Sequence, residues 1–363
     1  MPRNMITSNA ALFTALAVTV GELVSPEVRR QKRAVRTNHD ERRWLQRLTL
    51  RVSSHLFLGP SSKIALGAFE DNFYIIAIGV EIVNPPLELE RVAVNAGIFT
   101  AIASELSLPV LSAVDLSERL REYVFYPVEG PVELFDMEVI RPYFQRFEIF
   151  RVDSASALAL DSELGLRAAM AAIMSAPGAM ALQWPAITIE RLKYMIRDPQ
   201  ERAPFHLLLR ALTEVRDDAA FLSIYRCIEQ LFPIPAIAEL STALGLSGPA
   251  LQIATAIEHH LGWRRREEEA ITHLFSELDT SLVERMLGVV GVAANSESRS
   301  RPVAKRIYEL RNQCVHYRPI HSSDGIMPFS DWLALSDLML EAVQCLYARY
   351  AGAFDESRVK IAV

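Results

Sequence analysis

The chain has 363 residues, of which half are hydrophobic and 23% are charged, and its formal net charge is −6. This composition is typical of a globular protein and excludes an intrinsically disordered chain. The length exceeds what one hydrophobic core usually serves, so two domains are expected. A negative net charge gives no overall attraction to nucleic acid, and any RNA binding must therefore come from a local basic patch.

The N-terminal segment 10–24 is fairly apolar but is interrupted by Thr14, Thr19 and Glu22. It is too short to span a bilayer, so we expect a helix packed on the N-terminal domain and no membrane partner. The three cysteines, at positions 227, 314 and 345, are not spaced like metal ligands or a redox pair. Small buried thiols are the expected state, which favours a reducing, cytoplasmic location.

The first part of the chain, residues 1–197, is predicted to be an α+β domain. Segments rich in β-branched and aromatic residues predict strands, and proline- and glycine-containing turns separate them. These predicted strands cover residues 48–58, 73–83, 123–126 and 147–152, with helices at 92–106, 158–174 and 188–196. The polar stretch 197–204, with two prolines, predicts the domain boundary. No motif assigns this domain to a family.

From residue 204 to 352 the chain is predicted to be an all-α bundle, followed by a tail at 353–363. Helical periodicity covers 207–215, 221–232, 236–244, 249–263, 267–278 and 281–290, and a last helix covers 330–350 with Ser330 as its N-cap. Between them, Pro302 and Pro319 bracket a further helix of about four turns. A polar loop is expected at 317–328.

The helix between the two prolines has two chemically different faces. Apolar residues recur at i, i+4, i+7 and i+11, which predicts one buried stripe made of Val303, Ile307, Leu310 and Cys314. At about 100° per residue, Asn312 and His316 lie roughly opposite this stripe, and Arg311 lies on its flank. The arrangement is typical of a functional site more than of a core.

The sequence Arg311-Asn312-x-x-x-His316 resembles the Arg and His signature of the HEPN superfamily, whose helical domains include many metal-independent ribonucleases. Residues 218–233 are similar to the first long helix of Apea-like HEPN domains. The loop and the final helix after the motif agree with the order of elements in the superfamily. The resemblance covers residues 204–352 and does not extend to the first half.

This resemblance implies a catalytic site made of Arg311, Asn312 and His316, with no metal or cofactor. His316 would act as acid or base because imidazole titrates near neutral pH. Arg311 would offset the charge that develops on the phosphorane. Asn312 would orient the imidazole or donate to the phosphate. Lys305 lies on the same helical face, where either a phosphate contact or a solvated lysine fits.

The resemblance also implies partners. One chain supplies one motif histidine, and the superfamily joins two motifs across a two-fold axis, so a homodimer or higher homo-oligomer acting on RNA is expected. Such proteins often serve antiviral defence or toxin systems, in which the other domain senses a trigger or partner protein. A non-catalytic HEPN-like dimerisation or binding module is the alternative function.

Simpler interpretations remain open for several of these residues. Arg311 could pair with Glu309 or a distant carboxylate, and His316 could stabilise the helix C-terminus. Glu229 could lie near the site, although a helix-surface carboxylate is the simpler interpretation. The Arg/Glu run at 264–269 is typical of a solvated helix joint. The basic run at 29–47 fits a phosphate contact and a plain surface segment equally well.

Overall fold

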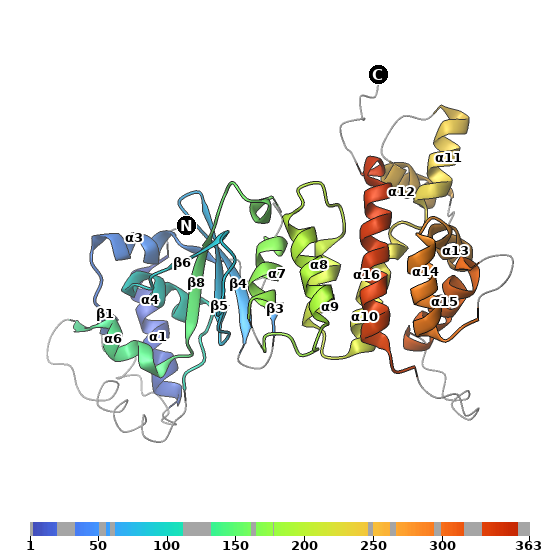
Figure 1. The fold of residues 1–363 in the computed structure, drawn as a ribbon. Helices are drawn as coiled ribbons and strands as arrows, with labels where there is room; N and C mark the ends of the chain where they lie inside the picture. The colour runs from blue at the N-terminus through green and yellow to red at the C-terminus, as the bar shows by residue number, and fades with distance from the viewer. Residues whose placement is uncertain are drawn as a thin grey trace. The chain divides into compact units, whose positions relative to one another are not determined.

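The computed structural model describes residues 3–19, 33–50, 56–58, 62–111, 132–160, 165–176, 178–245, 250–261, 266–293, 299–315 and 329–354. The chain divides into two compact units, Met1–Ala179 and Met180–Val363. The first is an α/β region and the second is helical, as the sequence predicts (Figure 1). The predicted strand at 123–126 lies outside the described residues.

Unit 1 is built around an antiparallel six-stranded sheet in the order β2-β4-β5-β8-β6, with β3 also paired to β4. A separate parallel pair joins β1 to β7. The strands are β1 (Arg33–Val35), β2 (Thr49–Leu50), β3 (Leu56–Phe57), β4 (Lys63–Phe69), β5 (Asn72–Ile78), β6 (Leu89–Val92), β7 (Glu133–Phe135) and β8 (Phe147–Val152). In the sheet centre Ile76 of β5 pairs with Ala65 of β4 and Ile149 of β8.

Strand β4 is central to this sheet, yet the sequence did not predict it. Its residues include two alanines and a glycine, which have low strand propensity, so no strand signal arises locally. Pairing with β5 and burial of most of its side chains supply the stability instead. The turn that joins them places Glu70 and Asp71 at positive φ, as a type I′ hairpin turn requires.

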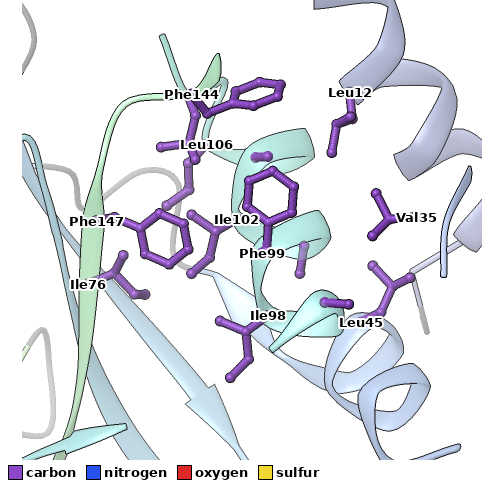
Figure 2. Packing of buried hydrophobic residues seen from close by; sticks show 14 of the residues in the cluster. Leu12, Val35, Leu45, Ile76, Ile98, Phe99, Ile102, Leu106, Phe144 and Phe147 are labelled. Atoms are coloured by element: carbon purple, nitrogen blue, oxygen red, sulfur yellow. The ribbon is translucent and has the colours of Figure 1, made fainter. Parts of the chain in front are cut away.

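Several helices of unit 1 cover one face of the sheet. They include α1 (Met5–Thr19), α3 (His39–Arg47) and α4 (Ala96–Glu105), with the short α6 (Met137–Ile140) and η2 (Arg141–Tyr143) nearby. Figure 2 shows Phe99 and Ile102 of α4 packed toward Ile76 and Phe147 of the sheet. Gly97 is required where α3 meets α4, because a Cβ there would lie 1.8 Å from the carbonyl oxygen of Glu41.

The basic run at 29–47 is partly accounted for by structural contacts. Residues 29–32 lie outside the described part of the chain. Arg33 is buried and pairs with Glu133, and Arg43, on α3, pairs with Glu70. Both arginines therefore have partners within unit 1: Arg33 is a buried structural residue, and only Arg43 fits the surface-segment interpretation.

The remaining helices follow the predicted order closely. Unit 1 ends with η3 (Ala157–Ala159) and α7 (Leu166–Met174). Unit 2 contains α8 (Ala186–Arg197), α9 (Phe205–Thr213), α10 (Asp217–Glu229), α11 (Ile234–Leu244), α12 (Ala250–Leu261), α13 (Glu267–Ser276), α14 (Thr280–Val290), α15 (Ser300–Val315), α16 (Trp332–Arg349) and η5 (Ala351–Ala353). Figure 1 shows α16, in red, beside α10 and α14, which it contacts.

Helix α8 belongs to unit 2, although the predicted boundary at 197–204 follows it in the chain. Thr188 donates to Asp337 on α16 at 2.8 Å, and Arg191 forms an ion pair with Glu341 at 2.8 Å. These contacts join α8 to α16 across a long stretch of sequence. The polar, proline-containing stretch at 197–204 therefore does not mark the division between the two units, which lies at Ala179 and Met180.

Two local predictions for unit 2 were wrong. Helix α16 begins at Trp332 with Asp331 as N-cap, not with Ser330, and the Asp331 side chain makes no capping hydrogen bond. Of the three cysteines expected to be buried, Cys227 is buried, Cys314 is half-buried and Cys345 is exposed; all three are free. Burial raises the pKa of the Cys314 thiol to about 11.

No helix among the described residues combines the length and apolar character needed to cross a membrane.

Candidate functional site around Arg311

Helix α15 presents the two faces that its sequence predicts. Val303, Ile307 and Leu310 are completely buried and attach the helix to its own unit. Cys314, the fourth residue of the predicted stripe, is half-buried because it lies in the last turn. On the other side, Lys305 is exposed and Asn312 is half-buried. The helix is therefore anchored along one face and offers polar side chains along the other.

Arg311, on α15, is held by side chains from two other helices. Its Nη2 donates to Oε1 of Glu229, at the end of α10, at 3.0 Å. Its Nη1 lies 3.5 Å from Oε2 of Glu267, the first residue of α13. The Arg311 side chain is 18% exposed, against 27% for Glu229 and 41% for Glu267. The guanidinium is thus closely surrounded by protein on one side and approaches solvent beside Glu267.

Arg311 stays protonated in this environment. Desolvation by partial burial acts to lower the pKa of Arg311, but the attraction of Glu229 and then Glu267 outweighs it and raises that pKa above its ordinary value. A guanidinium is protonated in proteins even without such help. The site therefore presents a permanent cation.

An aromatic ring lies beside the guanidinium. The Cζ of Arg311 is 5.9 Å from the centroid of the Tyr225 ring, within the range of a cation–π contact. Tyr225 is buried on α10, and burial raises the pKa of its phenol. Its hydroxyl has no hydrogen-bond partner among the described residues. Tyr225 and Glu229 are four residues apart on α10, so one helical face provides both contacts to Arg311.

Asn312 is coupled directly to Arg311. The Nη1 of Arg311 donates to Oδ1 of Asn312 at 3.0 Å, which assigns the orientation of the amide. With its oxygen engaged by the guanidinium, the side chain offers its amide nitrogen as a donor. Asn312 is therefore suited to donate to a phosphate oxygen or to an unprotonated imidazole nitrogen.

The structure brings together some of the predicted site residues. Arg311 and Asn312 are in contact, and Lys305 is exposed two turns earlier on α15. His316 lies outside the described residues, as does the predicted loop at 317–328. Of the interpretations left open, Glu229 does contact Arg311.

Of the two pairings left open for Arg311, the one with a distant carboxylate is confirmed by Glu229 and Glu267, and the one with Glu309 is wrong. Glu309 pairs with Arg306 at 3.4 Å and not with Arg311. Glu267 was interpreted as part of a solvated face, and Tyr225 was not singled out. The i, i+4 spacing of Tyr225 and Glu229 was the available signal for α10. Nothing in the local sequence connects α13 with α15.

Within the described part of the chain, no group of three or more His, Cys, Asp or Glu side chains is arranged to hold a metal ion. The chain matches no protein-family model, no curated protein and no solved structure. The function is therefore inferred from the side chains that surround Arg311.

Proposed function

We propose that unit 2 is a metal-independent endoribonuclease of the HEPN type and that the protein is an RNA-cleaving effector of an antiviral defence or toxin-type system in the cytoplasm. One observation carries this proposal: Arg311 is held by Glu229 and the Tyr225 ring directly beside Asn312. In the sequence, the motif histidine at position 316 follows Asn312 by four residues. A guanidinium whose orientation is set by such contacts is prepared to bind phosphate oxygens without further ordering.

The proposed chemistry divides three tasks among the motif residues. His316 exchanges a proton with the ribose 2′-hydroxyl or with the leaving 5′-oxygen. Arg311 stabilises the charge that gathers on the phosphorane, and Asn312 donates to a phosphate oxygen or to the imidazole. Attack by the 2′-oxygen leaves a 2′,3′-cyclic phosphate. The second acid or base comes from the motif of a second copy, so the working site is a composite of two chains.

A second function is favoured by a different observation. Glu229 and Glu267 together carry more negative charge than Arg311 carries positive charge. An arginine so engaged can serve as a structural ion pair between three helices. Unit 2 would then be a non-catalytic HEPN-like module for dimerisation or binding, with unit 1 sensing a trigger or partner protein in either case.

Cleavage of RNA by the full-length protein in buffer containing EDTA separates these functions. We expect products that end in a 2′,3′-cyclic phosphate. His316→Ala should lower the cleavage rate by about 10²- to 10⁴-fold, the usual contribution of general acid–base catalysis. His206→Ala, which removes an exposed histidine on α9, is the matched control and should cleave at the parental rate.

The outcomes are distinct. Activity that disappears in EDTA and returns with magnesium would overturn the metal-independent mechanism. Equal rates for the parental protein and His316→Ala would remove the catalytic role of His316. A protein that binds RNA without cutting it would favour the non-catalytic module.

A further inference from the structure

A groove of about 840 Å³ runs along α13 and α15. The two helices pack against each other in antiparallel directions, because Glu267 at the start of α13 lies beside Arg311 near the end of α15. At the other end of the groove, Ser276 of α13 and Ser300 of α15 both contribute to its lining. Glu267 lines the groove as well, so the groove begins next to the guanidinium of Arg311.

The side of α15 next to this groove carries a polar stripe. Arg301, Lys305, Tyr308 and Asn312 follow one another at i, i+4, i+7 and i+11, which places them on one helical face. Arg301 and Tyr308 line the groove, and Lys305 between them is exposed. At about 1.5 Å per residue, the stripe extends about 16 Å from the first turn of α15 to Asn312.

We propose that this groove is a binding site for single-stranded RNA next to the phosphate that is cleaved, an inference that rests on the function proposed above. Tyr308 provides the ring on which a base stacks, one turn before Arg311. Arg301 and Lys305 contact the phosphates that lead away from the site. Such a combination of an aromatic ring and cations along one line is how proteins hold single strands without reading their sequence.

The acidic residues of the groove determine whether attraction to phosphates or stacking on Tyr308 contributes more to RNA binding. Glu267 faces Arg311 at 3.5 Å, and Glu269 pairs with Arg266 at 3.4 Å, so their charges are partly offset. Glu268 adds a further negative charge to the lining. Electrostatic attraction to the backbone is therefore modest here, and stacking on Tyr308 should supply most of the binding. An A-form duplex keeps its bases stacked inside and cannot use this ring.

The test measures binding separately from cleavage. The probes are short fluorescent 2′-O-methyl oligonucleotides of each base, which lack the attacking hydroxyl, together with a duplex of the same chemistry. Binding to the full-length protein is followed by fluorescence anisotropy at several salt concentrations. We expect single strands to bind more tightly than the duplex.

Variants at Tyr308 give the sharpest comparison. Tyr308→Leu should weaken single-strand binding at least about fivefold, because base–aromatic stacking is worth about 1–3 kcal/mol per base. Tyr308→Phe should bind like the parental protein, since it keeps the ring. Tyr194→Leu removes a tyrosine from α8 that is 64% exposed and should change nothing. Lys305→Gln should reduce the slope of log K against log salt by about 0.7, the value for one phosphate contact to a single strand.

Equal binding by Tyr308→Leu and the parental protein would overturn the groove as an RNA site, as would equal losses with Tyr308→Leu and Tyr194→Leu. Neither result affects the ribonuclease proposal, which depends on cleavage by the parental protein and its loss in His316→Ala. If the protein binds RNA through Tyr308 but does not cleave it, the ribonuclease proposal would be overturned and the groove would remain an RNA-binding site.

Discussion

At the scale of single residues, Arg311 is bound by two carboxylates that differ in position. Glu229 is the closer and the less exposed of the two, and it holds the guanidinium from α10 together with the Tyr225 ring. Glu267 is more exposed and lines the end of the groove next to Arg311. We therefore assign Glu229 to positioning, whereas Glu267 occupies the side from which a phosphate would approach.

This difference predicts that Glu267→Gln strengthens RNA binding, because the variant removes a negative charge that competes with phosphate for Arg311. The gain should be at most about fivefold, since an exposed ion pair is worth about 0.2–1 kcal/mol. Glu268→Gln is the matched control: it removes the same charge from the same groove but leaves the ion pair between Glu267 and Arg311 in place, and it should give a smaller gain. Anisotropy with 2′-O-methyl single strands measures both. Identical gains would mean that Glu267 acts only through overall charge.

At the scale of elements, α15 serves as both a core helix and the carrier of the site. Its buried face joins α10, α13 and α14, and the Arg311 contacts connect the ends of α10 and α13 to the last turn of α15. The spacing alone predicts that no motif residue matters for folding. Because Arg311 forms ion pairs with Glu229 and Glu267, we expect it to contribute to stability, whereas Asn312 is still expected to contribute little.

Unfolding measurements on α15 variants test this separation of roles. Leu310→Ala, at a fully buried position, should lower the free energy of unfolding by about 2–5 kcal/mol. Arg311→Ala leaves Glu229 and Glu267 without their partner and should cost about 1–3 kcal/mol. Asn312→Ala should cost less than about 1 kcal/mol. Urea unfolding followed by circular dichroism gives all three values. A loss well above about 3 kcal/mol in Arg311→Ala would indicate that the ion pairs are primarily structural.

At the scale of the whole molecule, the proposed chemistry requires two copies of unit 2. The face of α15 that carries Lys305 and Asn312 lies opposite the buried stripe and is available to a second motif helix. In a two-fold interface, residue i of one copy contacts residue j of the other, and residues near the axis meet their own symmetry mates. The same face would thus hold the substrate and the partner chain.

We predict a dimer in solution at micromolar protein concentration that depends on this face. Asn312→Arg should weaken the dimer, because it places additional cations near the two-fold axis. Tyr194→Arg introduces the same charge on an exposed position of α8 and should leave the dimer intact. Light scattering coupled to size-exclusion chromatography measures the mass of each. A parental monomer that stays monomeric when RNA is added would contradict the composite site.

The sequence by itself determined the helices of unit 2 and the two faces of α15. Apolar residues recur every three or four positions along these helices, and this periodicity is a property of the local sequence. In the structure, the periodic residues Val303, Ile307 and Leu310 of α15 are buried. The same local signals predicted β5 and β8 in unit 1, where β-branched and aromatic residues concentrate.

Only the tertiary structure decided which side chains surround Arg311. Glu229 precedes it by 82 residues, and Tyr225 and Glu267 come from two different helices. No local pattern relates these positions to Arg311, because their meeting with it depends on how α10, α13 and α15 pack. The same reason explains β4, whose alanines and glycine form a strand only through pairing with β5. Contacts between distant segments are a property of the packed chain, whereas periodicity belongs to each segment alone.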